Sequence, residues 1–106
     1  MAASATKFSV NETGHRFEWN LNGKVGFIDY KKIGNRITLL HTEIPPEFRN
    51  RGEGTAFVEE TLRYIKENHF NIIVLCTFVQ AYLKKHPEWT DLIDPHFRIK
   101  GFNDEK

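Results

Sequence analysis

The sequence contains a single cysteine and lacks long hydrophobic runs. Because Cys76 has no partner for an internal disulfide, it indicates a reducing compartment, and we expect a cytoplasmic protein. No apolar segment approaches the ~20 residues that a membrane span needs. The opening MAASATK lacks the apolar core of a signal peptide. We therefore expect no association with a membrane.

Excess charge and metal-binding motifs are also missing. Fifteen Lys and Arg against 14 Asp and Glu leave a net charge of +1, so the whole molecule has no electrostatic attraction to nucleic acid. The five histidines show no ligand spacing, and one cysteine offers no Cys-x-x-Cys pair, which predicts no metal site. With 106 residues, we expect one domain over 1–106, frayed at 1–7 and about 98–106. It would be a monomer or a weak homodimer.

Alternating apolar residues predict an antiparallel meander in the first half of the chain. The predicted strands cover residues 15–21, 24–31 and 36–44, with a further short strand at Lys7–Val10. Asn22-Gly23 is a strong hairpin signal, and Gly34-Asn35 marks a second turn. Pro45-Pro46 ends the third long strand, because proline cannot continue the ladder.

The second half of the chain predicts helices around one buried strand. Helical periodicity runs from Thr55 to about Asn68, with Val58, Leu62 and Ile65 on one face. The apolar run IIVLC, residues 72–76, is typical of a buried parallel strand. A short helix over 78–86 would stop at Pro87, before a weakly patterned tail. A strand–helix–strand unit of this kind makes a right-handed crossover, so the predicted fold class is α+β with a mixed sheet.

Two glycines and two arginines lie in the segment Arg49-Asn50-Arg51-Gly52-Glu53-Gly54, between a strand and a helix. Glycines let a ligand approach the backbone, and a helix N-terminus favours an anion, so the segment predicts a phosphate or pyrophosphate cradle. A plain turn with solvated arginines is the alternative. A P-loop is excluded because Thr55 follows Gly54, and a dinucleotide loop because Phe57 replaces the third glycine.

Arg-x-x-Gly-x-Gly between a strand and a helix resembles the acyl-CoA loop of the GNAT superfamily of N-acetyltransferases. HTEIPPEFRNRGEGTAFVEETL, followed by VLCTFVQAYLKKHPEW, is similar to the small single-domain YjdJ-type subgroup, over about residues 15 to 95. The resemblance implies a compact GNAT-like fold, in which the meander precedes a β-α-β-α unit with splayed parallel strands. It also implies acetyl-CoA or coenzyme A as co-substrate and an amine acceptor, either a small molecule or a protein. The C-terminal hairpin that shapes the acceptor pocket of larger members is missing or replaced by the tail.

The resemblance also implies a donor site. Main-chain N–H groups of the glycine loop would bind the pyrophosphate, and pantetheine would lie between the splayed strands. Tyr82 would protonate the thiolate, Lys85 and His86 could reach the nucleotide phosphates, and Glu53 should point away from a diphosphate. The implied donor-binding residues are Ile44, Arg49, Asn50, Arg51, Gly52, Glu53, Gly54, Thr55, Cys76, Phe78, Tyr82, Lys85 and His86.

Four residues are candidates for catalysis: Cys76, His41, Glu43 and Tyr82. Cys76 precedes a helix N-terminus, where a thiolate is favoured and could carry an acetyl group, as the resemblance also suggests. The alternative is a small buried hydrophobe. His41, on the strand expected beside Cys76, is a base or an orienting group, or else only a packed histidine. Glu43 shares its face and lies near where many GNAT enzymes keep a general base, or else is only solvated.

Three functions follow as hypotheses. The first is N-acetyl transfer, either direct, with Tyr82 protonating the leaving thiolate, or in two steps through Cys76. The second is a non-catalytic CoA or acyl-CoA-binding module that acts as a sensor or protein-interaction domain. The third is a domain that binds another protein and has lost the ligand.

Overall fold

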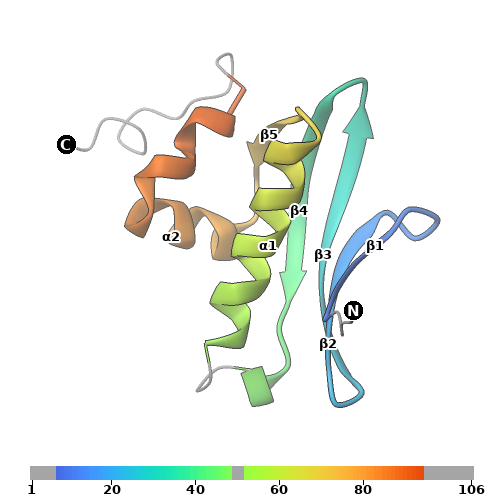
Figure 1. Cartoon of the computed structure of the whole chain (residues 1–106). Coiled ribbons are helices and arrows are strands. Elements are labelled where there is room, and N and C mark those ends of the chain that lie inside the picture. Colours follow the sequence, from blue (N-terminus) through green and yellow to red (C-terminus); the bar gives the residue numbers. More distant parts are fainter. Residues whose placement is uncertain (1–6, 49–51, 95–106) are drawn as a thin grey trace.

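The computed structural model describes residues 7–48 and 52–94, which form a five-stranded sheet with both helices on one face (Figure 1). The strands are β1 (Phe8–Asn11), β2 (Arg16–Leu21), β3 (Lys24–Ile33), β4 (Arg36–Glu43) and β5 (Asn71–Val74). The helices are α1 (Glu53–Glu67) and α2 (Thr77–Lys85), with short 3₁₀ helices η1 (Pro46–Phe48) and η2 (Pro87–Leu92). The predicted α+β fold class is confirmed. None of the helices in these described ranges is long and apolar enough to cross a membrane.

The strands follow the sequence order across the sheet, β1-β2-β3-β4-β5. The first four form the predicted antiparallel meander, and β5 pairs in parallel with β4 after the α1 crossover. This pairing joins Arg36–Leu39 to Asn71–Val74 and ends there, while β4 continues to Glu43. The parallel strands therefore part halfway along β4, as the predicted splaying requires.

Most element boundaries differ from the predictions by one or two residues, and three of the differences have a clear meaning. β3 extends to Ile33 rather than residue 31. α1 begins at Glu53, not Thr55, because Gly52 in the left-handed conformation (φ 72°) turns the chain directly into the helix. β5 ends at Val74, since the amides of Leu75 and Cys76 both bond the Leu39 carbonyl and the chain then turns into α2.

The tail beyond Trp89 is also more ordered than its pattern predicts. Residues 87–92 form η2, which begins at a proline, and the Thr90 hydroxyl bonds the Pro87 carbonyl at 2.7 Å. Ile93 then bridges to Ile72 of β5 and is 3% exposed. Isolated apolar residues such as Ile93 give no periodic signal, which explains why local pattern missed this contact. Residues 95–106 lie outside the described part of the chain.

One hydrophobic core lies between the sheet and the helices. Val58, Leu62 and Ile65 of α1 are fully buried, so the predicted apolar face of this helix is confirmed. Phe17 and Leu39 cover the inner face of the sheet at 0% exposure. Each such side chain contributes about 1.5–3 kcal/mol through burial. The core therefore holds α1 in a defined place against the sheet, and with it the start of the helix.

Candidate functional site

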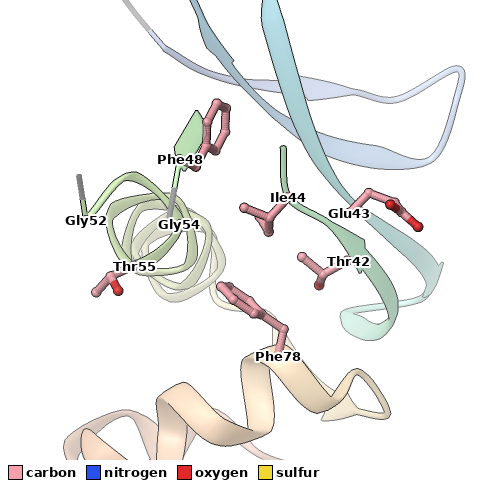
Figure 2. A pocket seen from close by; sticks show the side chains of 8 residues that line it. All are labelled: Thr42, Glu43, Ile44, Phe48, Gly52, Gly54, Thr55 and Phe78. Carbon is pink, nitrogen blue, oxygen red and sulfur yellow. The ribbon is translucent and has the colours of Figure 1, made fainter. Parts of the chain in front are cut away.

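A cavity of about 500 Å³ opens between the end of β4, the start of α1 and the first turn of α2 (Figure 2). Its lining residues are Thr42, Glu43, Ile44, Phe48, Gly52, Gly54, Thr55 and Phe78. Five of the predicted donor-binding residues therefore lie together here: Ile44, Gly52, Gly54, Thr55 and Phe78. Of the predicted catalytic residues, Glu43 lines the same cavity. The structure adds Thr42 and Phe48, which the sequence patterns did not indicate.

The first turn of α1 presents backbone donors at this cavity. The first helical hydrogen bond runs from the Ala56 amide to the Gly52 carbonyl, at 3.0 Å. The amides of Gly54 and Thr55 lie before it and have no acceptor within the helix. Together with the helix dipole, such amides favour an anion. Pyrophosphate binding at this turn stays a prediction, and the cavity lies beside the helix N-terminus where it was predicted.

Gly54 lies where the helix meets the aromatic ring of α2. A Cβ atom at this position would lie 3.1 Å from Cζ of Phe78 and 3.7 Å from Cγ2 of Ile44. Figure 2 shows the Phe78 side chain pointing from α2 into the space between α1 and the end of β4. Only glycine at position 54 keeps the Phe78 ring in its place and also lets a ligand come close to the backbone of this turn. The arginines and asparagine at 49–51, predicted as donor ligands, lie outside the described residues.

Glu53 points away from the cavity, which explains an acid inside a predicted anion loop. Its carboxylate accepts a 2.8 Å hydrogen bond from Nε1 of Trp19, a buried side chain of β2, and pairs with Lys7 at 3.3 Å. Glu53 is not among the cavity-lining residues. The acid therefore ties the first turn of α1 to the sheet and does not repel an anion in the cavity.

We expect Glu53→Ala to lower the free energy of unfolding by about 1–3 kcal/mol, because the buried Trp19 N–H loses its acceptor. Urea unfolding followed by tryptophan fluorescence measures this. Glu60→Ala, another acid on α1, serves as the control and should cost less than about 0.5 kcal/mol. Equal effects from the two variants would contradict the assignment of Glu53 as an anchor.

A β-bulge in β4 decides which side chains face the cavity. Asp29 of β3 pairs with His41, but the next residue, Tyr30, pairs with Leu39, so Leu40 is an extra residue in β4. Before the bulge, Leu39 faces the core. After it, Thr42 takes the inward position opposite the buried Ile28. Simple alternation from Leu39 places His41 inward, so the sequence pattern by itself does not indicate Thr42 as a cavity residue.

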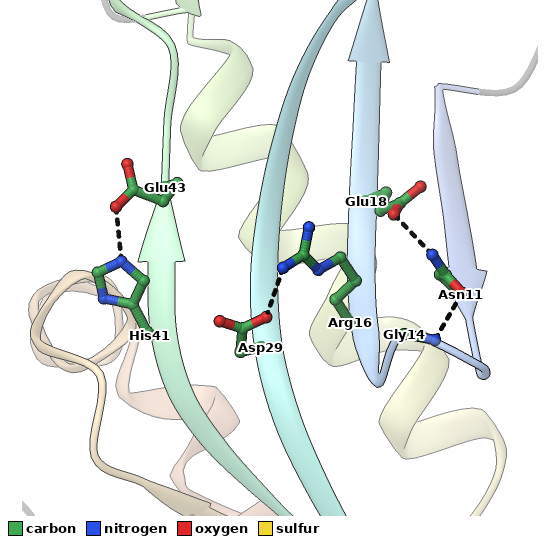
Figure 3. Close-up of polar contacts among 7 residues, drawn as sticks. All are labelled: Asn11, Gly14, Arg16, Glu18, Asp29, His41 and Glu43. Carbon is green, nitrogen blue, oxygen red and sulfur yellow. Dashed lines mark hydrogen bonds and ion pairs between the residues drawn. The ribbon is translucent and has the colours of Figure 1, made fainter.

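His41 and Glu43 consequently lie on the open face of the sheet, away from both helices (Figure 3). His41 Nε2 is 2.6 Å from a carboxylate oxygen of Glu43, and the two side chains are 58% and 59% exposed. They share a face, as the two-residue spacing predicts. Glu43 also belongs to the lining of the main cavity, so this residue borders both sides of the strand end, while its carboxylate lies with His41 on the open face.

Cys76 contacts Thr42, not His41. Its Sγ lies 2.6 Å from the Thr42 hydroxyl, and the residue is 4% exposed as the N-cap of α2. Cys76 and His41 do line one smaller cavity of about 250 Å³, where β4 and β5 part. Its full lining is Leu40, His41, Thr42, Leu75, Cys76, Thr77 and Phe78. The thiol is thus near the parting of the strands and is covered.

Tyr82, Lys85 and His86 line a third cavity of about 170 Å³, together with Thr55, Phe78 and Ala81. The ring of Tyr82 stacks on His86 with centroids 4.3 Å apart. Burial raises the pKa of Tyr82 above its ordinary value, and the charge of Glu59 adds to the shift, so the phenol keeps its proton at neutral pH. Because Phe78 lines all three cavities, it separates Tyr82 from the main one.

Comparison with known proteins places this geometry in a family. Residues 16–92 match the sequence family of GCN5-related N-acetyl-transferases, which covers both sides of the cavity. The chain belongs to this family. The match includes Thr42, Gly54 and Cys76, so the three cavities all lie within the family region.

Individual relatives agree with the family assignment. Protein NATD1 from Gallus gallus and from Mus musculus are each 32% identical over 59 residues, which is 55% of this chain and 54% of theirs. The matched region therefore spans about half the length of these curated relatives. Protein NATD1 from Xenopus tropicalis is 25% identical over 88 residues, covering 80% of this chain and 81% of its own. The NMR structure of a GCN5-like protein from Staphylococcus aureus superposes with a TM-score of 0.64 at 23% identity, over 87% of this chain and 91% of that one. This likeness supports the fold.

Proposed function

We propose that this protein is an acetyl-CoA-dependent N-acetyltransferase of the compact YjdJ-type subgroup, acting on an amine. The observation that carries the proposal is the main cavity. There, the N-terminal turn of α1, with Gly54 and Thr55 in the cavity wall, lies next to the end of a strand that has parted from its neighbour. A cytoplasmic location agrees with a free, buried cysteine.

The residues present suit a coenzyme A donor. Amides of Gly54 and Thr55 would hold the diphosphate, and charge-assisted hydrogen bonds of this kind contribute roughly 1.5–3 kcal/mol each. The backbone of β4 beyond Leu39 has no pairing partner on the β5 side among the described residues, so its polar groups remain for a pantetheine arm. Lys85 and His86 would reach the nucleotide end through the third cavity.

Acetyl-CoA would supply a thioester whose acetyl carbon forms a C–N bond with the amine as the C–S bond breaks. The acceptor reaches neutral solution as an ammonium ion and must first lose a proton. We assign Glu43, hydrogen-bonded to His41, to accept that proton directly or through water. The Tyr82 phenol holds a proton at neutral pH, and we assign it to protonate the leaving sulfur. That role requires the half-exposed ring of Phe78 to turn aside.

Direct transfer is the route that the burial of Cys76 favours. A two-step route needs the acetyl carbon to bond to Sγ while the thiol proton leaves with coenzyme A. In the structure Cys76 is buried, and its Sγ is hydrogen-bonded to the Thr42 hydroxyl. We therefore expect Cys76→Ala to retain turnover within about tenfold, whereas Glu43→Gln lowers kcat by about 10²-fold or more.

Coenzyme A release from acetyl-CoA and a panel of primary amines measures these rates. Mass spectrometry of the wild type mixed with acetyl-CoA alone then checks the route. An acetyl group found on Cys76, together with an inactive Cys76→Ala protein, would establish the two-step route instead. If acetyl-CoA neither stabilises the protein nor reacts, the proposed function is wrong.

One observation favours the non-catalytic alternative. Within the described residues, no helix or loop covers the open face of the sheet, where an acceptor would approach Glu43 (Figure 1). A protein that holds coenzyme A for sensing or for protein interaction needs no acceptor pocket. Acetyl-CoA binding in calorimetry without turnover across the amine panel would support this alternative.

A further inference from the structure

A separate hollow lies on the open face of the sheet, at the end of β4. It measures about 460 Å³ and is lined by Val25, Phe27, His41, Glu43, Ile44, Pro45 and Pro46. Two of these residues, Glu43 and Ile44, also line the main cavity. The open-face hollow and the main cavity therefore meet at the last residues of β4, on opposite sides of the sheet.

The open-face hollow has one charged end and an apolar body. Glu43 supplies the one carboxylate of its lining and is bonded to His41, while no lysine or arginine is part of that lining. The remaining wall is hydrocarbon from β3 and the Pro45-Pro46 turn, and it includes Val25 at 42% exposure. A cation at Glu43 with an apolar group beside it would complement these walls.

Neighbouring charges outside the hollow are already balanced. Arg16 lies over the ring of Phe27 at 3.8 Å from its centroid and pairs with Asp29 at 3.2 Å. Lys24 pairs with Glu47 at 3.6 Å. Because these opposite charges offset each other, the carboxylate of Glu43 dominates the potential inside the hollow. A carboxylate-bearing ligand is disfavoured there, and an ammonium is favoured.

We propose that this hollow binds the acceptor, a small primary amine with an apolar body. Its ammonium would lie at Glu43 and its body on Val25, Phe27 and Pro45. This inference rests on the proposed function, because the hollow and the proposed donor cavity share Glu43 and Ile44 in their walls. β5 ends at Val74, so no described strand pairs with β4 on that side beside Thr42 and Glu43. The volume falls in the range of about 300–1,000 Å³ that small ligands occupy.

Phenethylamine, titrated into isotope-labelled protein without coenzyme A, tests the site independently of activity. We expect amide shifts at Val25, Phe27, His41 and Glu43. Phenylethanol lacks the charge and ethylamine lacks the apolar body, so each should bind at least about tenfold more weakly. Glu43→Gln should weaken phenethylamine binding by about tenfold or more. Glu18→Gln is the control, since Glu18 lies on the same face but bonds Asn11 (Figure 3).

A second pair of variants keeps the test independent of Glu43. Val25→Lys places a cation in the hollow and should abolish phenethylamine binding, whereas Ile33→Lys changes another exposed apolar residue of β3 outside it. The proposal would be overturned if the two variants bound phenethylamine equally well, or if amide shifts were confined to the helical face of the sheet. Binding of a peptide N-terminus but not of phenethylamine would also overturn it. Stabilisation by acetyl-CoA alone is measured in parallel. If acetyl-CoA stabilises the protein but phenethylamine does not bind, only this inference is wrong. If phenethylamine binds but acetyl-CoA does not stabilise the protein, only the proposed donor is wrong.

Discussion

We expect the replacement of Gly54 by valine to remove the stabilisation that acetyl-CoA, the proposed donor, gives this protein. At a ligand concentration 100-fold above Kd, the wild type should gain about 2.7 kcal/mol. A Cβ at position 54 would already lie 3.1 Å from the Phe78 ring, and valine adds two methyl groups at the amides that face the cavity. We expect the gain to fall below about 0.5 kcal/mol, as it does when Kd rises at least 100-fold. Thermal unfolding with and without acetyl-CoA measures both values.

The unliganded variant should remain close to the wild type in stability. Valine has a higher helix propensity than glycine, by a few tenths of a kcal/mol, which offsets part of the cost of moving the half-exposed Phe78 ring. Ala56→Val is the matched control, because it adds a β-branched side chain to the same turn but does not line the cavity. A retained acetyl-CoA effect in Gly54→Val would exclude this turn as the donor site. Loss of the effect in both variants would indicate a general disturbance of α1.

Phe48→Ala should cost about 3–5 kcal/mol in the free energy of unfolding, a large part of the 5–15 kcal/mol typical of a domain. Phe48 is the last residue of η1, is 0% exposed, and forms part of the cavity wall. Its ring fills the space above Gly26, where an added Cβ would lie 3.0 Å from Cε2 of Phe48. The Phe48 ring therefore anchors η1, which follows β4 in the chain, against the middle of β3.

Urea unfolding of Phe48→Ala and Phe78→Ala compares a buried with a half-exposed phenylalanine of the same cavity. The second variant should lose about 1 kcal/mol or less, since most of the burial term is absent. Similar losses in both would contradict the role of Phe48 as an anchor. Gly26→Ala gives an independent check, because its Cβ would also lie 3.2 Å from the Glu43 carbonyl, and overpacking of this kind costs about 1–3 kcal/mol.

Local pattern in the sequence was enough for most of the fold. The alternation around Phe17 and Trp19, the Asn22-Gly23 hairpin and the apolar face of Val58, Leu62 and Ile65 predict the meander and α1, and the structure confirms them. These signals are local, because strand and helix periods are set by the backbone within a few residues. The glycine loop was likewise predicted next to the helix start, where Gly52 and Gly54 now line the main cavity.

Tertiary structure alone decided how the site is oriented. The bulge at Leu40 turns Thr42 inward toward Cys76 and sends His41 and Glu43 to the open face. No local pattern announces such an extra residue, because it depends on register with β3. Glu53 is similar, since its partner Trp19 is 34 residues away. The sequence by itself determined the elements and placed the glycine segment at the start of α1. The packing of β4 between β3 and β5 decided which side chains reach the cavity beside that segment.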